Sequence, residues 1–461
     1  MLFSTPLFLF GFFPLFFTLY WLVPARTVWL LLGSLFFYAW GEPEFLWVVL
    51  AASLLDWRIG QQIVRAPAQS RAARGWLALG VGSNLLILTY AKYTPFLIQN
   101  FNDLLGMLGV SPCTVPQMQV PLGVSFFVFE EITYLTDLYR GVALPPSGFK
   151  DYLNYLLFFP KMLAGPIVKY HDISAQLKSP QSTYSGARDG LLRFIQGLAR
   201  KVLIADTLAP VADQVFALPA YTLDSSAAWL GLICFSLQIY FDFSGYSDMA
   251  IGMAQMMGFR LHENFRDPYL ADSVTDFWRR WHISLSTWIR EYLYIPLGGN
   301  RLGGWRRYLN LCFCFLLSGL WHGASWTFVV WGCFHGFGLI FDRAVWLKLQ
   351  PRIPRLLRVL LTDAWVALSW VFFRCQTLPQ AGTFLMALGG ASPLHANAVF
   401  WRSDILFVIL LGVVLILIPQ RSSTTVRDSR PLALLWAMLL LILSVARMLV
   451  NGYHPFIYFR F

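Results

Sequence analysis

The chain has 461 residues, of which 57% are hydrophobic and only 13% are charged. Soluble domains carry about 25% charged residues, so this composition excludes a soluble enzyme, a disordered scaffold and a nucleic-acid-binding protein. The apolar residues occur in tracts of about 15–25, the length that a helix needs to cross a bilayer, whereas barrel strands would alternate in polarity. The sequence therefore predicts an all-α integral membrane protein.

The formal net charge is +11, but in a membrane protein the position of the basic residues matters more than their sum. Lys and Arg concentrate in 58–74, 260–307, 343–358 and 421–430 and are absent from 95–120 and 209–226. The positive-inside rule places the first set of segments in the cytoplasm and the second set outside.

Followed along the chain, this rule predicts about eleven membrane elements in a single polytopic domain over 1–461, with both termini outside. The predicted spans are 3–23, 28–40, 45–57, 76–92, 121–138, 190–208, 227–252, an inward-facing hairpin or pair near 308–341, 359–373, 403–419 and 431–450. The long segments 139–189 and 253–307 are expected to lie on the bilayer or to dip into it. Six cysteines without C-x-x-C spacing predict neither a disulfide framework nor a metal site.

Ionisable side chains at membrane depth are functional candidates, because hydrocarbon makes them costly. His322 lies within Leu316–Trp326, where small neighbours would let another backbone or a slender substrate approach the imidazole. Imidazole is the usual base that takes a proton from a hydroxyl or thiol, although a histidine hydrogen-bonded between helices is the alternative. His335 is a rival base. On one straight helix the two rings would face nearly opposite ways, unless the chain breaks at Gly323.

Two acidic clusters also fall in predicted spans. Asp242 and Asp248 are six residues apart, about 240° around a helix, so they do not share a face as a paired general acid and base would. We expect one near the cytoplasmic interface and the other at a helix break. For Glu130 and Glu131 the sequence indicates neither a partner nor a role.

The segment 272–300 predicts an amphipathic helix in the inner membrane interface, beginning at a capping box over Ser273–Asp276. The apolar residues at helical spacing are Trp278, Trp281, Leu285, Trp288 and Tyr292, with the tryptophans expected at headgroup level. The arginines fit contact with anionic lipids, and they equally fit the phosphates of a nucleotide-linked thioester donor, whose entrance His282 would line. The candidate donor-binding residues are Arg279, Arg280, Arg301, Arg306 and Arg307.

Several motifs follow one another along nearly the whole chain. They are Pro121–Phe127 with Tyr139–Gly141, Phe159–Pro160 with 164–166, Phe241–Ala250, Phe277–Ser286, Leu320–Gly323 and the closing Pro455–Phe459. Together they resemble the membrane-bound O-acyltransferases, in the bacterial alginate O-acetyltransferase branch.

This resemblance implies eleven spans around a central tunnel, with His322 as the essential histidine and His282 at the second polar position. It assigns Asp242, Ser244, Asp248, Trp321 and Gly323 to tunnel or structural motifs. It further implies transfer of acetyl from a cytoplasmic donor, acetyl-CoA, across the bacterial inner membrane, with no bound cofactor. Periplasmic partner acetyltransferases would then place the acetyl groups on an exopolysaccharide, alginate foremost.

Other functions remain open at this stage. Acetylation of cellulose or another exopolysaccharide, and D-alanyl transfer to teichoic acid, use the same kind of chemistry. A transporter or flippase is the alternative from a different class, since intramembrane polar residues and interfacial arginines are expected there too. A transporter would move an intact solute without consuming a thioester.

Overall fold

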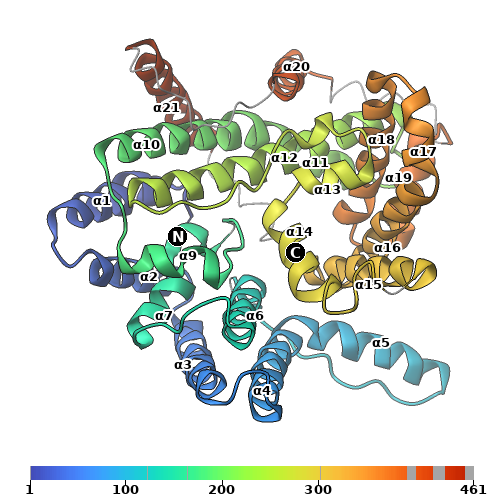
Figure 1. The fold of residues 1–461 in the computed structure, drawn as a ribbon. Coiled ribbons are helices and arrows are strands. Elements are labelled where there is room, and N and C mark those ends of the chain that lie inside the picture. Colours follow the sequence, from blue (N-terminus) through green and yellow to red (C-terminus); the bar gives the residue numbers. More distant parts are fainter. Residues whose placement is uncertain are drawn as a thin grey trace. The chain divides into compact units, whose positions relative to one another are not determined.

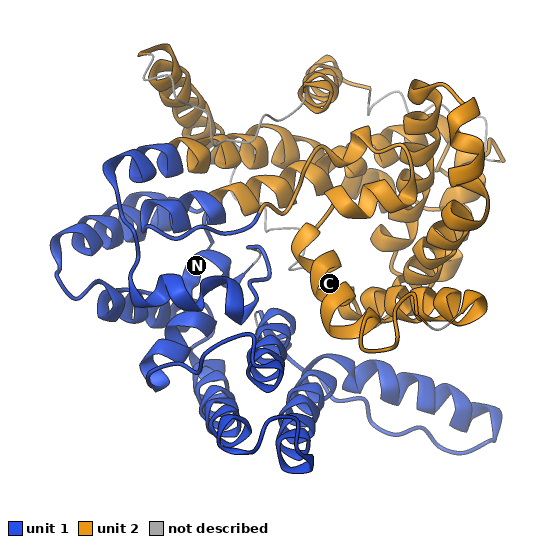
Figure 2. Ribbon diagram, viewed as in Figure 1, with its two compact units in different colours: residues 1–191, 250–262 blue, residues 192–249, 263–461 orange. Residues whose placement is uncertain are grey.

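The structure is a computed structural model that describes residues 2–121, 123–163, 165–301, 303–391, 401–418 and 431–451. Every regular element in these ranges is a helix, which confirms the all-α prediction (Figure 1). The closing motif Pro455–Phe459 lies outside the described residues. Contacts divide the chain into two compact units (Figure 2): the first comprises 1–191 and 250–262, the second 192–249 and 263–461.

In the first unit, helices occupy the predicted spans 3–23, 28–40, 45–57, 76–92 and 121–138, and further helices lie within 94–107 and 149–178, where no span was predicted. The helices of this unit are η1 (Leu7–Phe12), α1 (Phe13–Leu22), α2 (Arg26–Gly41), α3 (Pro43–Arg65), α4 (Arg71–Leu88), η2 (Thr89–Tyr93), α5 (Thr94–Met107), α6 (Val124–Arg140), α7 (Phe149–Leu156), α8 (Phe159–Met162) and α9 (Tyr170–Lys178). The boundary between the units falls within α10 (Tyr184–Ala199) and again within α12 (Ser225–Met256). The predicted span 190–208 lies in a longer helical stretch, because α10 passes through a π-helical turn, η3 (Arg200–Ala205), into α11 (Asp206–Phe216).

The second unit contains the remaining helices of the chain. They are η4 (Pro268–Leu270), α13 (Val274–Arg280), α14 (Ile283–Trp288), η5 (Ile289–Tyr294), α15 (Gly304–His322), α16 (Trp326–Phe341), η6 (Asp342–Trp346), α17 (Leu347–Leu349), η7 (Gln350–Arg352), α18 (Arg355–Arg374), α19 (Leu378–Leu388), α20 (Ser403–Leu417) and α21 (Pro431–Asn451). Within the described residues, four helical stretches are long and apolar enough to cross a membrane: Ser225–Met256, Trp326–Arg352, Arg355–Arg374 and Pro431–Val450. The shorter apolar helices there are Leu7–Leu22, Leu378–Leu388 and Ser403–Leu417.

The predicted hairpin near 308–341 is confirmed as the helix pair α15 and α16. Glycines allow the two backbones to approach closely: a Cβ atom added at Gly319 would collide with the carbonyl oxygen of Phe328, and one added at Gly332 with that of Phe315. Close approach through small residues is the usual way that helices pack in lipid, where no hydrophobic effect drives them together. The turn between the two helices therefore has a tightly fixed position.

Glu130 and Glu131, for which the sequence indicated no partner, lie buried on α6 in the first unit. Glu130 forms an ion pair with Lys161, which is itself buried and comes from the segment that follows α7. Glu131 lies near the buried carboxylate of Asp56 on α3, close enough for the two like charges to repel each other. Asp56 Oδ2 accepts a hydrogen bond of 2.6 Å from Asn84 Nδ2 on α4. The hydrogen bond joins α3 to α4, and the ion pair joins α6 to the segment after α7.

Candidate active site

His322 is the last residue of α15, and its side chain is only 5% exposed. Aromatic rings surround it: the imidazole centroid lies 4.9 Å from the ring of Trp321, 5.1 Å from Trp331 and 5.3 Å from Phe373, each roughly edge to face. The C-terminus of a helix carries a partial negative charge, which favours the imidazolium that forms when a histidine accepts a proton. The position therefore suits a general base that is shielded from bulk water.

The chain breaks directly after this histidine. Gly323 is extended, with φ −162° and ψ 147°, and α16 begins three residues later. A side chain at Gly323 would collide with the ring of Phe328, so glycine is required for packing here and not for a positive φ. The break removes the objection that His322 and His335 face opposite ways on one helix.

His335 has the hydrogen bonds of a structural histidine. It lies on α16 with no exposed surface, Trp278 Nε1 donates to its Nδ1 at 3.2 Å, and its Nε2 lies 2.9 Å from Ser369 Oγ. Because the indole N–H can only donate, Nδ1 is the acceptor and Nε2 carries the hydrogen. Both ring nitrogens are occupied, so His335 is the structural histidine and His322 the stronger candidate base.

The expected single amphipathic helix over 272–300 is wrong. The chain forms α13, then breaks at Trp281 and His282, and continues as α14 and η5. His282 has φ +44° and ψ 54°, a left-handed conformation that is unusual for a residue other than glycine and that often marks a functional site. The cap at the start is confirmed, since Ser273 Oγ accepts a hydrogen bond from the backbone N–H of Asp276 at 3.1 Å.

The tryptophans of this segment do not face outward, as those of an amphipathic surface helix would. Trp278, Trp281 and Trp288 are all buried in the protein, with Trp281 only 1% exposed. The ring of Trp281 stacks on Phe277 at 5.5 Å and lies 5.1 Å from Trp370. The amphipathic pattern thus reflected a face packed on other helices of the same unit. The spacing of apolar residues alone could not distinguish that face from a lipid-facing one.

His282 is fully buried, and burial lowers its pKa to about 3, so the imidazole is neutral. Its Nδ1 lies 3.2 Å from Asn264 Oδ1, while its Nε2 is buried and makes no hydrogen bond within the described part of the chain. The ring lies 4.7 Å from Phe243 and 6.3 Å from Trp321. Trp321 therefore packs against both candidate histidines and links them within the second unit. Sequence reasoning missed Asn264, because no spacing rule connects an asparagine to a histidine 18 residues later.

The acidic residues of α12 form ion pairs, and neither marks a helix break, because α12 runs without interruption from Ser225 to Met256. Asp242 lies 3.1 Å from Lys201 Nζ, which also contacts Asp206 at 2.5 Å. Asp248 binds two arginines that the sequence did not suggest, Arg193 at 2.8 Å and Arg200 at 2.6 Å. Asp242 and Asp248 therefore fasten α12 to the α10–α11 segment.

Ser244 lies on α12 between these two aspartates. It is buried, and its Oγ has no hydrogen-bond partner among the described residues. A buried hydroxyl of this kind is available to a water molecule or a substrate.

The predicted donor-binding arginines fall into two groups. Arg279, Arg301 and Arg306 are exposed, as a binding site for a soluble phosphate compound requires. Arg280 forms an ion pair of 2.8 Å with Asp276, and Arg307 lies over the ring of Tyr308 at 5.1 Å. Arg279 and Arg280 lie on α13, whereas Arg301 precedes α15 and Arg306 and Arg307 lie in it, so donor binding by this set stays a prediction.

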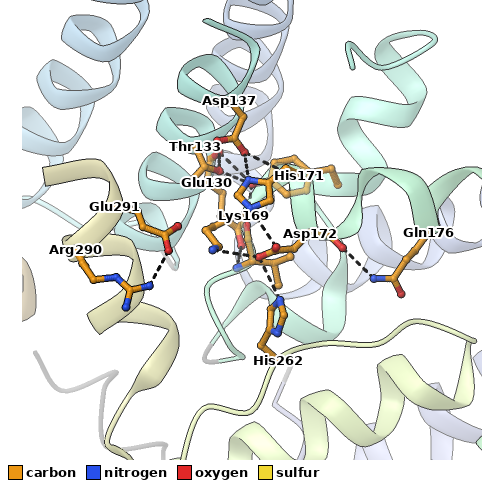
Figure 3. Close-up of polar contacts among 12 residues, drawn as sticks. Glu130, Thr133, Asp137, Lys169, His171, Asp172, Gln176, His262, Arg290 and Glu291 are labelled. Atoms are coloured by element: carbon orange, nitrogen blue, oxygen red, sulfur yellow. Dashed lines mark hydrogen bonds and ion pairs between the residues drawn. The ribbon is translucent and has the colours of Figure 1, made fainter. Parts of the chain in front are cut away.

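A second polar cluster lies in the first unit (Figure 3). His171 Nδ1 contacts Asp137 at 2.8 Å, its Nε2 contacts Asp172 at 3.2 Å, and His262 Nε2 contacts the other oxygen of Asp172 at 3.3 Å. These contacts hold α9 against α6 and the segment after α12. In the residues that the structure covers, no group of three or more His, Cys, Asp or Glu side chains could hold a metal ion.

Comparison with known proteins decides the family. The model of the membrane-bound O-acyltransferase family matches residues 124–375, a range that contains both His282 and His322. The chain belongs to this family. It is therefore a membrane-bound O-acyltransferase.

Individual relatives of this acyltransferase support the assignment. A probable alginate O-acetylase of Pseudomonas putida is 38% identical in an alignment of 487 positions that covers 100% of both chains. A probable alginate O-acetylase of Azotobacter vinelandii is 44% identical over 84% of this chain and 78% of its own length. A peptidoglycan O-acetyltransferase of Helicobacter pylori is 37% identical over 86% of this chain and 82% of its own.

Proposed function

We propose that this acyltransferase takes acetyl groups from acetyl-CoA on the cytoplasmic side of the bacterial inner membrane. It passes them across the membrane for O-acetylation of an exopolysaccharide, with alginate as the polymer. The relatives named as probable alginate O-acetylases support this proposal, because they cover most or all of the chain. The observation that carries the chemistry is His322, buried among aromatic rings at the C-terminal end of α15.

In the proposed reaction, His322 is the general base. It removes the proton from the accepting hydroxyl as that oxygen attacks the thioester carbonyl, so a C–O bond forms and the C–S bond breaks. The imidazolium then returns the proton to the leaving thiolate of CoA. General base catalysis by a placed imidazole contributes about 10²–10⁴-fold to a rate, and the surrounding aromatic rings exclude the water that would hydrolyse the thioester.

The proposed donor site rests on the charge and exposure of three arginines, and the proposed acceptors lie on the opposite side of the membrane. Exposed Arg279, Arg301 and Arg306 provide cationic groups for the phosphates of CoA on the basic, cytoplasmic side. Periplasmic partner acetyltransferases accept the acetyl group on the outer side and deliver it to the polymer, which is the final acceptor. The Helicobacter relative is named for peptidoglycan, so peptidoglycan is the second acceptor to test.

Oriented proteoliposomes test the direction of transfer and the acceptor together. Labelled acetyl-CoA is supplied on the face that exposes the basic loops, and alginate or peptidoglycan fragments with a periplasmic acetyltransferase on the other face. We expect label on alginate in the opposite compartment, and none when Arg279, Arg301 and Arg306 are all replaced by Gln. Label that stays on the donor side, or appears only on peptidoglycan, would overturn the direction or the polymer respectively.

A further inference from the structure

We propose that Asn264 is a positioning residue that fixes the tautomer and the ring orientation of His282, so that His282 presents an unprotonated Nε2 to the reacting groups. The last part of this inference rests on the proposed function, since it assumes that His282 takes part in acyl transfer. The hydrogen-bond geometry of Asn264 itself is independent of that assumption.

Asn264 is 1% exposed and lies in the segment between α12 and α13. Its Nδ2 donates to Ser247 Oγ on α12 at 3.1 Å. Its Oδ1 accepts from Ser284 Oγ at 2.9 Å and from the backbone N–H of Ser284 at 3.2 Å. Because a backbone N–H can only donate, the atom that faces it must be the amide oxygen, and this fixes which way the amide points.

The same amide oxygen lies 3.2 Å from His282 Nδ1. An amide oxygen can only accept, so Nδ1 must carry the hydrogen of the neutral imidazole, and the lone pair is then on Nε2. Asn264 thus fixes the tautomer and orientation of the His282 ring, as a carboxylate or carbonyl partner does in many functional histidines, but it adds no charge.

Asn264 also supports the backbone of His282. Its carbonyl oxygen accepts a hydrogen bond of 2.9 Å from the N–H of Ile283, and its side chain binds the N–H of Ser284. The backbone N–H groups of Ile283 and Ser284 directly follow His282, the residue with φ +44°. Left-handed backbone at a residue other than glycine persists only where surrounding contacts enforce it, and Asn264 supplies two of those contacts.

With the hydrogen on Nδ1, Nε2 of His282 is a hydrogen-bond acceptor, and none of the described residues donates to it. His282 Nε2 is buried without a hydrogen-bond partner among them, and the ring packs near Trp321, the neighbour of His322. Buried polar atoms are nearly always paired, so this acceptor is available to a donor that the described residues do not supply. A substrate hydroxyl or the thiol of the departing donor has the required hydrogen.

Two substitutions at Asn264 separate positioning from simple structural support. Asn264→Ala removes the acceptor, and we expect kcat to fall at least about 10-fold while KM for the donor changes less than about two-fold. Asn264→Asp keeps an acceptor facing Nδ1–H but places a negative charge there, which stabilises the imidazolium. We expect this variant to regain most of the activity at high pH, with the acid limb of the kcat profile moved up by at least about one pH unit.

The matched control is Asn310→Ala. Asn310 is a buried asparagine on α15 that donates to Leu297 O at 3.1 Å, so its loss tests the general cost of removing a buried amide. We expect a lower melting temperature in this control with an unmoved pH profile. Equal losses of activity in Asn264→Ala and Asn264→Asp, with the acid limb in its wild-type position, would overturn the positioning role.

A spectroscopic readout keeps this inference separate from the proposed function. The chain has only seven histidines, so nitrogen NMR of ¹⁵N-histidine-labelled protein in bilayers can resolve the tautomer of His282, assigned by its loss in His282→Gln. We expect a neutral Nδ1–H ring in the wild type and a mixture of tautomers in Asn264→Ala. An Nε2–H ring in the wild type, or no change in the variant, would refute the inference whether or not acetyl-CoA is the donor.

Discussion

Substitution of Gly245 by Ala is expected to destabilise the second unit by forcing two helices apart. Gly245 belongs to the Phe241–Ala250 motif on α12 and faces α10 where the two backbones cross. A Cβ atom added there would lie 2.6 Å from the carbonyl oxygen of Gly197 and 3.1 Å from the amide nitrogen of Lys201. Both contacts involve backbone atoms, so neither partner can move away by a change of rotamer.

The loss of unfolding free energy in Gly245→Ala can be estimated from the overlap between the added Cβ and the carbonyl oxygen of Gly197. Carbon and oxygen atoms need a separation of about 3.2 Å, so the helices must move apart by roughly 0.6 Å along the crossing. Overpacking of this kind costs about 1–3 kcal/mol, which for a unit of this size lowers the melting temperature by about 2–4 °C per kcal/mol. The movement also stretches the ion pair between Lys201 and Asp242, whose charged atoms lie 3.1 Å apart.

Thermal unfolding in nanodiscs measures the effect. The matched control is Gly382→Ala on α19 of the same unit, where an added Cβ has no atom within 4 Å. This control is expected to be neutral or to gain about 0.4–1 kcal/mol, because alanine restricts the unfolded chain. If Gly245→Ala unfolds at or above the temperature of the control, the close crossing of α10 and α12 is wrong.

Three further outcomes test other parts of the structure. His335→Ala should lower the melting temperature, because two buried hydrogen bonds are lost, yet keep kcat within about three-fold of wild type in the folded fraction. Lys201→Met should cost about 3–5 kcal/mol by removing the buried cation that contacts the carboxylates of Asp242 and Asp206, and adding Asp242→Asn should recover part of that loss in the same unfolding assay. At Asp172, burial raises the pKa, but the ion pairs with His262 and other cationic neighbours outweigh burial and lower it. The ionised Asp172 therefore stabilises the fold fully above the ordinary Asp pKa of about 3.9, and this stabilisation is lost as the pH falls through the lower pKa that Asp172 has in the folded protein. In Asp172→Asn, the unfolding midpoint should no longer fall with pH in this range.

The sequence predicted the helical architecture well, because long apolar tracts leave few alternatives in a bilayer. The helix pair over 308–341 followed from the placement of the basic loops, and it is confirmed. A break at Gly323 was only the condition under which His322 and His335 would not face opposite ways, and the structure has that break. His322 was recognisable as an unusual residue in an apolar tract. The identity of the family depended on several motifs in order, and the match over residues 124–375 confirms it.

The errors share one physical cause. The break at His282 depends on hydrogen bonds to Asn264, and the pairing of Asp242 depends on Lys201, 41 residues earlier in the chain. A one-dimensional pattern reports the periodicity of a segment but not its partners. For this reason it predicted a continuous helix over 272–300, and it predicted a helix break at an aspartate of α12 where the structure has an ion pair.

The most direct test of the account is turnover of acetyl-CoA by the purified protein in nanodiscs. Release of labelled acetyl is compared for wild type and His322→Ala, with and without a periplasmic acceptor protein, and Asn310→Ala serves as a control for the loss of a buried polar side chain. The account predicts turnover in the wild type and in the control, and a loss of at least about 10² in folded His322→Ala. Transfer at the wild-type rate by His322→Ala would contradict the assignment of the base, and a folded wild type that never consumes acetyl-CoA would contradict the proposed donor.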